Sequence, residues 1–408
     1  MTPRWWGDAS PQARRALIAA GLGWTLDAFD VMLYALVLAA LMSDLGMAKP
    51  TAGLLGSLTL LASAAGGVIF GFVADRFGRT RALMGSILIY SVFTGACGLA
   101  QTVAQLAVFR VLLGLGMGGE WASGAALVSE TWPARHRGKA LGLMQSGWAI
   151  GYAAAAIVTA VVLPQWGWRA VFFVGILPAL FVVWIRRSVE EPAAWQQARV
   201  LAPAARASIG DIFRGSLGRL TLAVTLMNAL TMFAWWGFNL WIPAYLSLPV
   251  AQGGVGLSSR TMSGFIVAMQ VGMWFGYVTF GFISDAIGRK RAYVVYLLCA
   301  AALIFAYGAT RTPVVLLVLG PFVAFFGTGY FSGFGAVTAE IYPTSIRATA
   351  QGFTYNIGRV ASAVAPFMVG TVADTRGFGF ALAMASVAFL LAAVMWTWIP
   401  ETRGRELT

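Results

Sequence analysis

The stretch GFVADRFGRTR at residues 71–81 returns as GFISDAIGRKR at residues 281–291, 210 positions later. A second block repeats at the same offset, because ETWPARHRGKALG at 130–142 corresponds to EIYPTSIRATAQG at 340–352. Two blocks that share one offset indicate that the chain contains two copies of one unit. Parallel repeats of this kind are typical of membrane proteins in which two halves rock against each other.

The composition is that of a membrane protein. Hydrophobic residues make up 59% of the 408 positions and charged residues only 11%, with a mean hydropathy of +0.77. Apolar runs such as ALAMASVAFLLAAVMWTWI (381–399) reach about 20 residues, the length that a helix needs to cross a bilayer. The alternating strands of about 10 residues that build membrane barrels are absent. We therefore predict an all-α integral membrane protein.

The apolar runs predict twelve transmembrane helices in two pseudo-symmetric six-helix bundles. The expected spans are 16–42, 51–74, 82–100, 103–129, 138–163, 169–185, 220–248, 260–283, 292–310, 313–339, 349–373 and 378–398. A charged, proline-containing stretch divides them six and six. We expect a first bundle over 1–185, a cytoplasmic linker over 186–219 and a second bundle over 220–408.

The basic residues predict the orientation. Most of the 28 Lys and Arg residues fall in segments that face the cytoplasm if both termini do. This asymmetry favours a multi-pass protein of the cell inner (cytoplasmic) membrane with both termini inside. It also explains the net charge of +13 without nucleic acid, because these loops face anionic headgroups. Cys97 and Cys299 fall within spans, so neither a disulfide framework nor a metal site is expected.

Several motifs resemble those of a known family. The pattern G-x-x-x-D-R-x-G-R-x-R between the second and third spans resembles the signature loop of the major facilitator superfamily, and RVLLGLGMGG (110–119) resembles its fourth-span motif. DAFD (27–30), GMGGEW (116–121) and YNIGR (355–359) are similar to motifs of the organic-anion:proton symporters, which include sialate, monocarboxylate, aromatic-acid and nicotinate carriers. They also resemble the sugar-porter and metabolite:proton symporter branches. The resemblance covers nearly the whole chain and implies a monomer.

The repeated loops predict a cytoplasmic gate. Asp75 can pair with Arg79 or with a helix terminus, and the spacing also allows ion pairs of Glu130 with Arg137 and of Glu340 with Arg347. Pairs that form in one conformation and break in another would close the inner side. The full predicted gate is Asp75, Arg79, Glu130, Arg137, Asp285, Arg289, Glu340 and Arg347. The alternative is a static, solvated basic loop.

Charged residues within the predicted spans are the first functional candidates, since each costs ~2.5–3.5 kcal/mol or more at mid-span. Asp27 and Asp30 share one helical face, and Asp30 and Arg110 lie at compatible depths. Resemblance to sugar and metabolite symporters implies that Asp30 and Arg110 form the proton-coupling pair; a permanent structural salt bridge is the alternative. Glu120 is a second protonation site or a substrate acceptor, or else a structural partner of Arg110 or of the backbone. The only histidine, His136, lies in a loop.

Arg359 lies near the middle of the eleventh span, whose bundle has no acidic residue away from the span ends. A guanidinium there would bind a carboxylate through two hydrogen bonds, and the family resemblance implies the same role. The alternative is a pair with Glu120 or Asp27. Polar and aromatic residues at similar depth complete the predicted substrate site: Asn228, Trp235, Trp236, Asn239, Gln270, Tyr330, Tyr355 and Asn356. Each aromatic ring could instead serve helix packing or an interfacial belt.

We therefore predict a secondary transporter that imports a small organic anion, a monocarboxylate or aromatic acid, with protons by alternating access. Its expected partners are the acid, protons and the bilayer, with no nucleic acid, cofactor or metal. A sugar or polyol:proton symporter would keep Asp30 and Arg110 but would not need Arg359. A drug:proton antiporter would use Asp27 and Glu120 to bind a cation, and Arg359 argues against it. A receptor or intramembrane enzyme would need a sensor domain, metal cluster or nucleophile that the sequence does not show.

Overall fold

The structure, a computed structural model, describes residues 4–132, 134–191, 209–343 and 346–403. Residues 192–208 of the predicted linker lie outside this described part. The first half of the chain forms α1 (Arg4–Gly7), α2 (Pro11–Asp44), α3 (Lys49–Phe77), α4 (Arg79–Cys97), α5 (Val103–Thr131), α6 (Ala134–Val174) and α7 (Pro178–Ser188). The second half forms η1 (Ile209–Phe213), α9 (Ser216–Ser247), η2 (Val250–Gln252), α10 (Ser259–Ile287), α11 (Arg289–Ala309), α12 (Pro313–Thr328), α13 (Phe331–Ile341), α14 (Arg347–Arg376) and α15 (Phe378–Met395). The all-α prediction is confirmed.

Each of the twelve predicted spans coincides with a helical segment. Within the described part of the chain, 10 helices are long and apolar enough to cross a membrane. One of these, Lys139–Ser188, contains two predicted spans, because Gly167 interrupts α6 with a positive φ of 74°. The predicted span at 349–373 coincides with α14, which is more polar because it carries Asn356 and Arg359.

Backbone contacts divide the chain into two compact units. Unit 1 holds Met1–Leu41 and Leu58–Ala204, and unit 2 holds Met42–Ser57 and Ala205–Thr408. The first turns of α3 therefore belong to unit 2, where the hydroxyl of Ser57 accepts a hydrogen bond from the Phe367 backbone N–H at 3.1 Å. The predicted bundle limits at 185 and 220 stay a prediction, and each unit is described by itself below.

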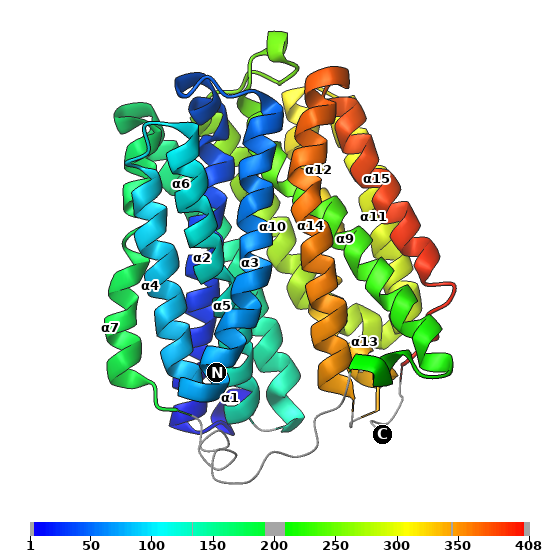
Figure 1. Cartoon of the computed structure of the whole chain (residues 1–408). Helices are drawn as coiled ribbons and strands as arrows, with labels where there is room; N and C mark the ends of the chain where they lie inside the picture. The colour runs from blue at the N-terminus through cyan, green and yellow to red at the C-terminus, as the bar shows by residue number, and fades with distance from the viewer. Residues whose placement is uncertain (1–3, 133, 192–208, 344–345, 404–408) are drawn as a thin grey trace. The chain divides into compact units, whose positions relative to one another are not determined.

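Unit 1 has a core around α4, which packs against α5 and against α7 (Figure 1). Leu83, Ile87 and Tyr90 of α4 are fully buried there together with Leu113 of α5 and Ile185 of α7. Leu83, Ile87 and Tyr90 follow one another at spacings of four and three, so they form one apolar stripe of α4. Burial of this stripe positions α4 and α5, which carry Tyr90, Arg110 and Glu120 of the site described below.

Unit 2 is built around α9, which packs against both α14 and α15 (Figure 1). The indole N–H of Trp241 on α9 donates to the carbonyl of Pro366 on α14 at 2.9 Å. The backbone N–H of the next residue, Phe367, donates to Ser57. The two hydrogen bonds therefore use the same peptide unit of α14. Two further helix pairs, α10 with α12 and α11 with α15, complete the unit.

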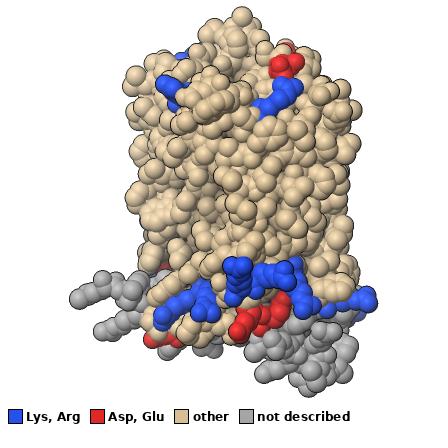
Figure 2. Space-filling model, turned by 90° about the vertical axis from the view of Figure 1, so that its left-hand side faces the viewer, with Lys and Arg blue, Asp and Glu red and all other residues tan. Residues whose placement is uncertain are grey.

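The outer surface of the helices is apolar, as a bilayer requires. Phe72 of α3 and Phe282 of α10, which are equivalent in the repeat, are 70% and 75% exposed. On the face that Figure 2 shows, Lys and Arg side chains form a band at one end, a few charged residues lie at the other, and the broad belt between them carries none. An uncharged belt between two charged rims is the surface expected of a membrane-spanning protein.

Candidate functional site

The α3–α4 turn of unit 1 is fixed by a carboxylate from beyond α7. Gly78 ends the turn with a φ of 119°, a conformation that favours glycine, and α4 begins at the next residue. The carboxylate of Glu191 accepts hydrogen bonds from the backbone N–H groups of Thr80 at 3.1 Å and Arg81 at 3.2 Å. A Cβ at Gly78 would lie 2.2 Å from Glu191 Oε1, so glycine also makes room for this cap.

The α10–α11 turn of unit 2 has the same construction. Gly288 has a φ of 99° and precedes α11. The carboxylate of Glu401 accepts from the backbone N–H groups of Arg289 at 2.9 Å and Lys290 at 3.2 Å. Both carboxylates lie at a helix N-terminus, where unpaired N–H groups and the helix dipole favour negative charge.

Sequence analysis missed these two caps. Glu191 and Glu401 are separated by the offset that relates the two halves, and each follows a β-branched residue and one other residue, in VEE (189–191) and IPE (399–401). This shared spacing is the sequence signal for the two caps, although both glutamates lie outside the repeated loop motifs.

Each unit contains one interhelical ion pair beside its capped turn. In unit 1, Arg79 Nη2 lies 3.0 Å from Glu130 Oε1, with side chains 15% and 24% exposed. In unit 2, Arg289 Nη2 lies 3.1 Å from Glu340 Oε1, with side chains 14% and 13% exposed. The arginine begins one helix and the glutamate ends another, so each pair ties two helices together at the loop end.

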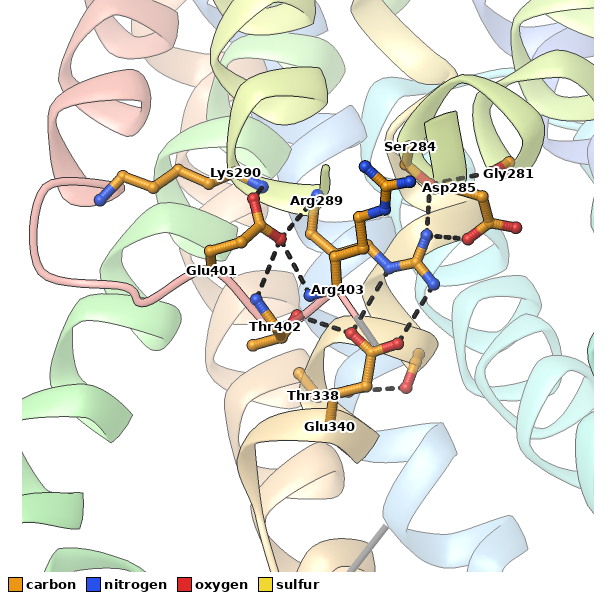
Figure 3. Close-up of polar contacts among 11 residues, drawn as sticks. Gly281, Ser284, Asp285, Arg289, Lys290, Thr338, Glu340, Glu401, Thr402 and Arg403 are labelled. Atoms are coloured by element: carbon orange, nitrogen blue, oxygen red, sulfur yellow. Dashed lines mark hydrogen bonds and ion pairs between the residues drawn. The ribbon is translucent and has the colours of Figure 1, made fainter. Parts of the chain in front are cut away.

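The unit 2 pair belongs to a larger cluster (Figure 3). Arg289 also contacts the carboxylate of Asp285, and its Nη1 donates to Ser284 Oγ at 2.9 Å. The hydroxyl of Thr402 donates to Glu340 at 2.6 Å. The residues after α15 thus contact both the start of α11 and the end of α13.

The observed partners differ from those that the sequence suggested. Among the described residues, Glu130 forms its ion pair with Arg79 and Glu340 with Arg289, whereas the sequence allowed pairs with Arg137 and Arg347. The side chains of Arg137, Arg347 and Asp75 lie outside the described residues, so the pairs predicted for them stay predictions. The physical reason for the difference is that neighbouring helix ends approach across the unit, whereas sequence spacing reveals only neighbours along one helix.

The pKa of Glu401 follows from its position at the start of α11. Partial burial raises the pKa, but four backbone N–H groups, those of Arg403, Arg289, Lys290 and Thr402, donate to the carboxylate and hold the pKa below its usual value. The stabilisation is therefore fully present above the ordinary glutamate pKa of about 4.3 and is lost as the pH falls through the lowered pKa.

We expect Glu401→Gln to lower the thermal midpoint of the purified protein by about 1–2 °C at pH 7, because one exposed cap is weakened. The gap between variant and wild type should shrink as the pH falls through the lowered pKa of Glu401, because the wild-type side chain then also becomes neutral. Glu190→Gln, an exposed neighbour of the other cap, is the matched control. Equal midpoints for Glu401→Gln and wild type at pH 7 would contradict the capping role.

Three carboxyl groups lie inside unit 1. Asp27, Asp30 and Glu120 are each exposed by 1% or less. Asp27 is within electrostatic range of both Asp30 and Glu120, and Tyr90 is within range of all three. A Cβ at Gly23 would lie 2.4 Å from Glu120 Oε1, so the missing side chain of that glycine accommodates the carboxyl group. The helices α2 and α5 thus bring the three predicted acids into one row.

The predicted ion pair of Asp30 with Arg110 is not formed in this structure. Both oxygens of Asp30, and Nε and Nη1 of Arg110, are buried without a hydrogen-bond partner among the described residues. The guanidinium carbon of Arg110 instead lies 4.1 Å from the ring centroid of Tyr34. The alternative partners suggested for Glu120 are likewise wrong here, because both of its oxygens lack a hydrogen-bond partner within the described chain. Similar predicted depth in the membrane does not determine which side chain an arginine contacts.

In unit 2, α9 and α14 bring three of the predicted substrate residues together. Arg359 is half-buried, and its guanidinium carbon lies 5.9 Å from the ring centroid of Tyr355, one turn earlier. The side-chain amide of Asn228 donates to the carbonyl of Thr354 at 2.9 Å and also lies against Gly358. Asn228 therefore fixes the α9–α14 contact beside Arg359.

The remaining polar and aromatic candidates have different surroundings. Trp235 is buried on α9, whereas Trp236 is only half-buried; Asn239 is buried on the same helix. Asn356 donates to the carbonyl of Gly352 on its own helix at 2.9 Å. Gln270 is buried, and its Oε1 has no hydrogen-bond partner in the described part of the chain.

Tyr330 belongs to an aromatic cluster that joins three helices. Its ring lies 6.0 Å from Tyr293, 6.3 Å from Phe389 and 4.7 Å from Phe331, and the Tyr293 hydroxyl donates to its carbonyl at 2.8 Å. These contacts join α11, α13 and α15 at the junction between α12 and α13. The structure thus gives Tyr330 a packing role within unit 2.

Comparison with protein families identifies the fold. The sequence matches the model of the Major Facilitator Superfamily over residues 20–258 and 245–408. The chain belongs to the major facilitator superfamily. Among curated relatives, a probable 4-methylmuconolactone transporter from Cupriavidus pinatubonensis is 35% identical over 98% of this chain and 93% of its own length. A cis,cis-muconate transport protein from Acinetobacter baylyi is 32% identical, over 93% of this chain and 92% of its own.

Solved structures of the major facilitator superfamily share the architecture. The xylose transporter XylE from E. coli, in a partially occluded inward-open conformation, matches with a TM-score of 0.79 at 19% identity and covers 98% of this chain and 100% of its own. At this identity the match shows the fold alone. Because its superfamily and its curated relatives are transporters, the chain is a membrane transporter and not an enzyme.

Proposed function

We propose that this transporter imports a small organic anion, a monocarboxylate or an aromatic acid, together with protons by alternating access. We place it in the inner membrane with both termini in the cytoplasm, as the distribution of basic residues favours. The muconate and methylmuconolactone carriers among its relatives support an organic-acid substrate.

The row of three buried carboxyl groups in unit 1 is the observation that carries the proposal. Carboxylates in a low-dielectric interior repel one another and lose hydration, so Asp27, Asp30 and Glu120 cannot all be ionised at once. The group that gains or loses a proton as the conformation changes would couple transport to the proton gradient. Arg110, stacked on Tyr34 rather than paired with Asp30, is then available to stabilise the ionised form in another conformation.

Arg359 supports the choice of an anion. Its guanidinium is half-buried on a helix that crosses the membrane, beside Tyr355 and near the buried amide of Asn228. An arginine in such surroundings is suited to bind a carboxylate through two charge-assisted hydrogen bonds. Trp235, Trp236, Asn239, Gln270 and Asn356 complete the proposed substrate site. Movement of a proton with a monoanion cancels the charge transferred, so an inside-negative potential would not oppose uptake.

The capped turns and ion pairs support a rigid role for the loop ends beside the predicted cytoplasmic gate. Arg79 with Glu130, and Arg289 with Glu340, tie the loop ends of helices together within each unit. We propose that these clusters hold each loop end as a rigid element during rocking, with Glu191 and Glu401 as additional members. Pairs that use Asp75, Arg137 and Arg347 would add to the gate.

The direct test is uptake by proteoliposomes under an imposed inward proton gradient. We expect labelled benzoate or nicotinate to accumulate several-fold above equilibrium, and to stop accumulating when an ionophore collapses the gradient. Labelled xylose serves as the control for a sugar symporter, and a lipophilic cation loaded inside serves for a drug antiporter. Gradient-driven xylose uptake without acid uptake would overturn the proposal.

A further inference from the structure

The backbones of α2 and α6 touch in unit 1. Gly147 and Gly151 of α6 face Gly21 and Thr25 of α2, and a Cβ at Gly151 would lie 1.8 Å from the Thr25 carbonyl oxygen. Small residues four apart allow such close approach of membrane helices. We call the line of contact between α2 and α6 the seam. The close approach determines which face of each helix lies on either side of it.

One side of this seam faces the exterior. Exposed apolar residues on these two helices include Ile18 and Leu22 on α2 and Leu143, Ile150 and Ile157 on α6. At about 100° per residue, Trp24 and Asp27 on α2 point away from that side, and so do Trp148 and Tyr152 on α6. The structure bears this out for burial, since none of these four side chains is more than 5% exposed.

Two indole rings meet on the buried side. Trp24 and Trp148 have ring centroids 4.8 Å apart at an interplanar angle of 48°. The Nε1–H of Trp24 and the hydroxyl of Tyr152 have no hydrogen-bond partner among the described residues, although both side chains are more than nine-tenths buried. Buried donors normally find an acceptor, so two such donors beside a ring pair need explaining.

The neighbouring charges restrict what could bind there. Asp27 lies one turn beyond Trp24, and the Glu120 carboxyl lies against Gly23, the residue before Trp24. A substrate carboxylate would be repelled by these acids when they are ionised. A flat, uncharged carbon framework would not be repelled, and indole rings favour contact with such a framework.

We propose that Trp24, Trp148 and Tyr152 form a subsite for the planar, unsaturated body of the transported acid. Trp24 and Trp148 contact its flat face, and Trp24 Nε1–H and the Tyr152 hydroxyl donate to an oxygen substituent on it. This inference rests on the proposed organic-acid transport and adds a selectivity to it: planar unsaturated acids are preferred over saturated acids of equal carbon number. It assigns that selectivity to α2 and α6.

The experiment compares matched acids as competitors of uptake in proteoliposomes. Benzoate is set against cyclohexanecarboxylate, and cis,cis-muconate against adipate, each as an inhibitor of whichever labelled acid accumulates. We expect wild type to favour the unsaturated member of each pair by about threefold to tenfold, the scale of aromatic contacts. Trp148→Leu should bring the ratio to within about twofold of unity, while Trp148→Phe keeps most of it.

Two further variants separate the subsite from general damage. Trp166→Leu removes an exposed tryptophan of the same helix and should leave the ratio unchanged. Tyr152→Phe removes only one hydroxyl and should reduce the preference for 4-hydroxybenzoate over benzoate by about fivefold, with little change in the benzoate ratio.

The outcomes are distinguishable. Acid uptake whose selectivity is the same in Trp148→Leu, Tyr152→Phe and wild type would overturn the subsite and leave the transport proposal intact. Absence of gradient-driven uptake of every acid in wild type would overturn both. If Trp148→Leu does not fold, the Tyr152→Phe preference for 4-hydroxybenzoate over benzoate decides, because that replacement removes only one hydroxyl and keeps the aromatic ring.

Discussion

Replacement of Arg359 by alanine is expected to reduce gradient-driven uptake of the organic acid by about tenfold to a hundredfold, the cost of losing charge-assisted hydrogen bonds to a carboxylate. The half-buried guanidinium of Arg359 lies on α14 beside Tyr355, and no other basic residue of α14 lies near the middle of the helix. Arg359→Lys keeps the charge but loses the fork of two donors, so we expect an intermediate loss. Initial rates of labelled acid uptake over a range of concentrations would measure both variants.

The matched control is Arg376→Ala, which removes an arginine from the last turn of the same helix. Its uptake should stay within about twofold of wild type, because a charge at the end of a span is solvated. Thermal midpoints of all three variants show whether the protein is folded. Normal acid uptake by folded Arg359→Ala would exclude this arginine as the carboxylate receptor and would favour the sugar symporter reading of the sequence.

The twelve-helix fold could be predicted because its signal is repeated along the chain. Apolar runs of membrane length and the two loop blocks at one offset each determine the architecture independently. The same offset contained the Glu191 and Glu401 caps, and it would have predicted them once extended to the residues after α7 and α15. The features that the sequence predicts are therefore those that lie close together along the chain and recur in both halves.

The contacts between side chains could not be predicted in the same way. Arg79 and Glu130 are 51 residues apart, as are Arg289 and Glu340, so the repeat implies that the two pairings match but does not reveal them. Arg110 illustrates the same limit, because Asp30 and Tyr34 lie one turn apart on the same face of α2 and the guanidinium contacts Tyr34. Which of the two side chains it contacts depends on how the whole unit packs, and the hydropathy of one span does not encode that packing.

Replacement of Asp30 by asparagine is expected to separate transport of the acid from the proton gradient. We expect Asp30→Asn to abolish accumulation of the acid under a proton gradient while exchange of labelled acid at equal concentrations on both sides keeps at least about a third of its rate. Asparagine resembles the protonated carboxyl group in shape but cannot release a proton, so the variant should change conformation without coupling. Proteoliposome accumulation and counterflow, measured side by side, separate these two activities.

Parallel variants decide which carboxyl group of the row carries the proton. Asp27→Asn and Glu120→Gln remove the other two buried acids, and Asp211→Asn, in η1 outside the spans, is the control that should resemble wild type. If Asp30→Asn still accumulates acid several-fold under the gradient, the coupling group is another member of the row, identified by the variant that exchanges without accumulating. Because Asp27 is within electrostatic range of both neighbours, its variant should also alter the pH dependence of exchange. Loss of the Asp27 carboxylate would change the energy of ionising its two neighbours, so we expect the variant to alter coupling even if another member of the row carries the proton.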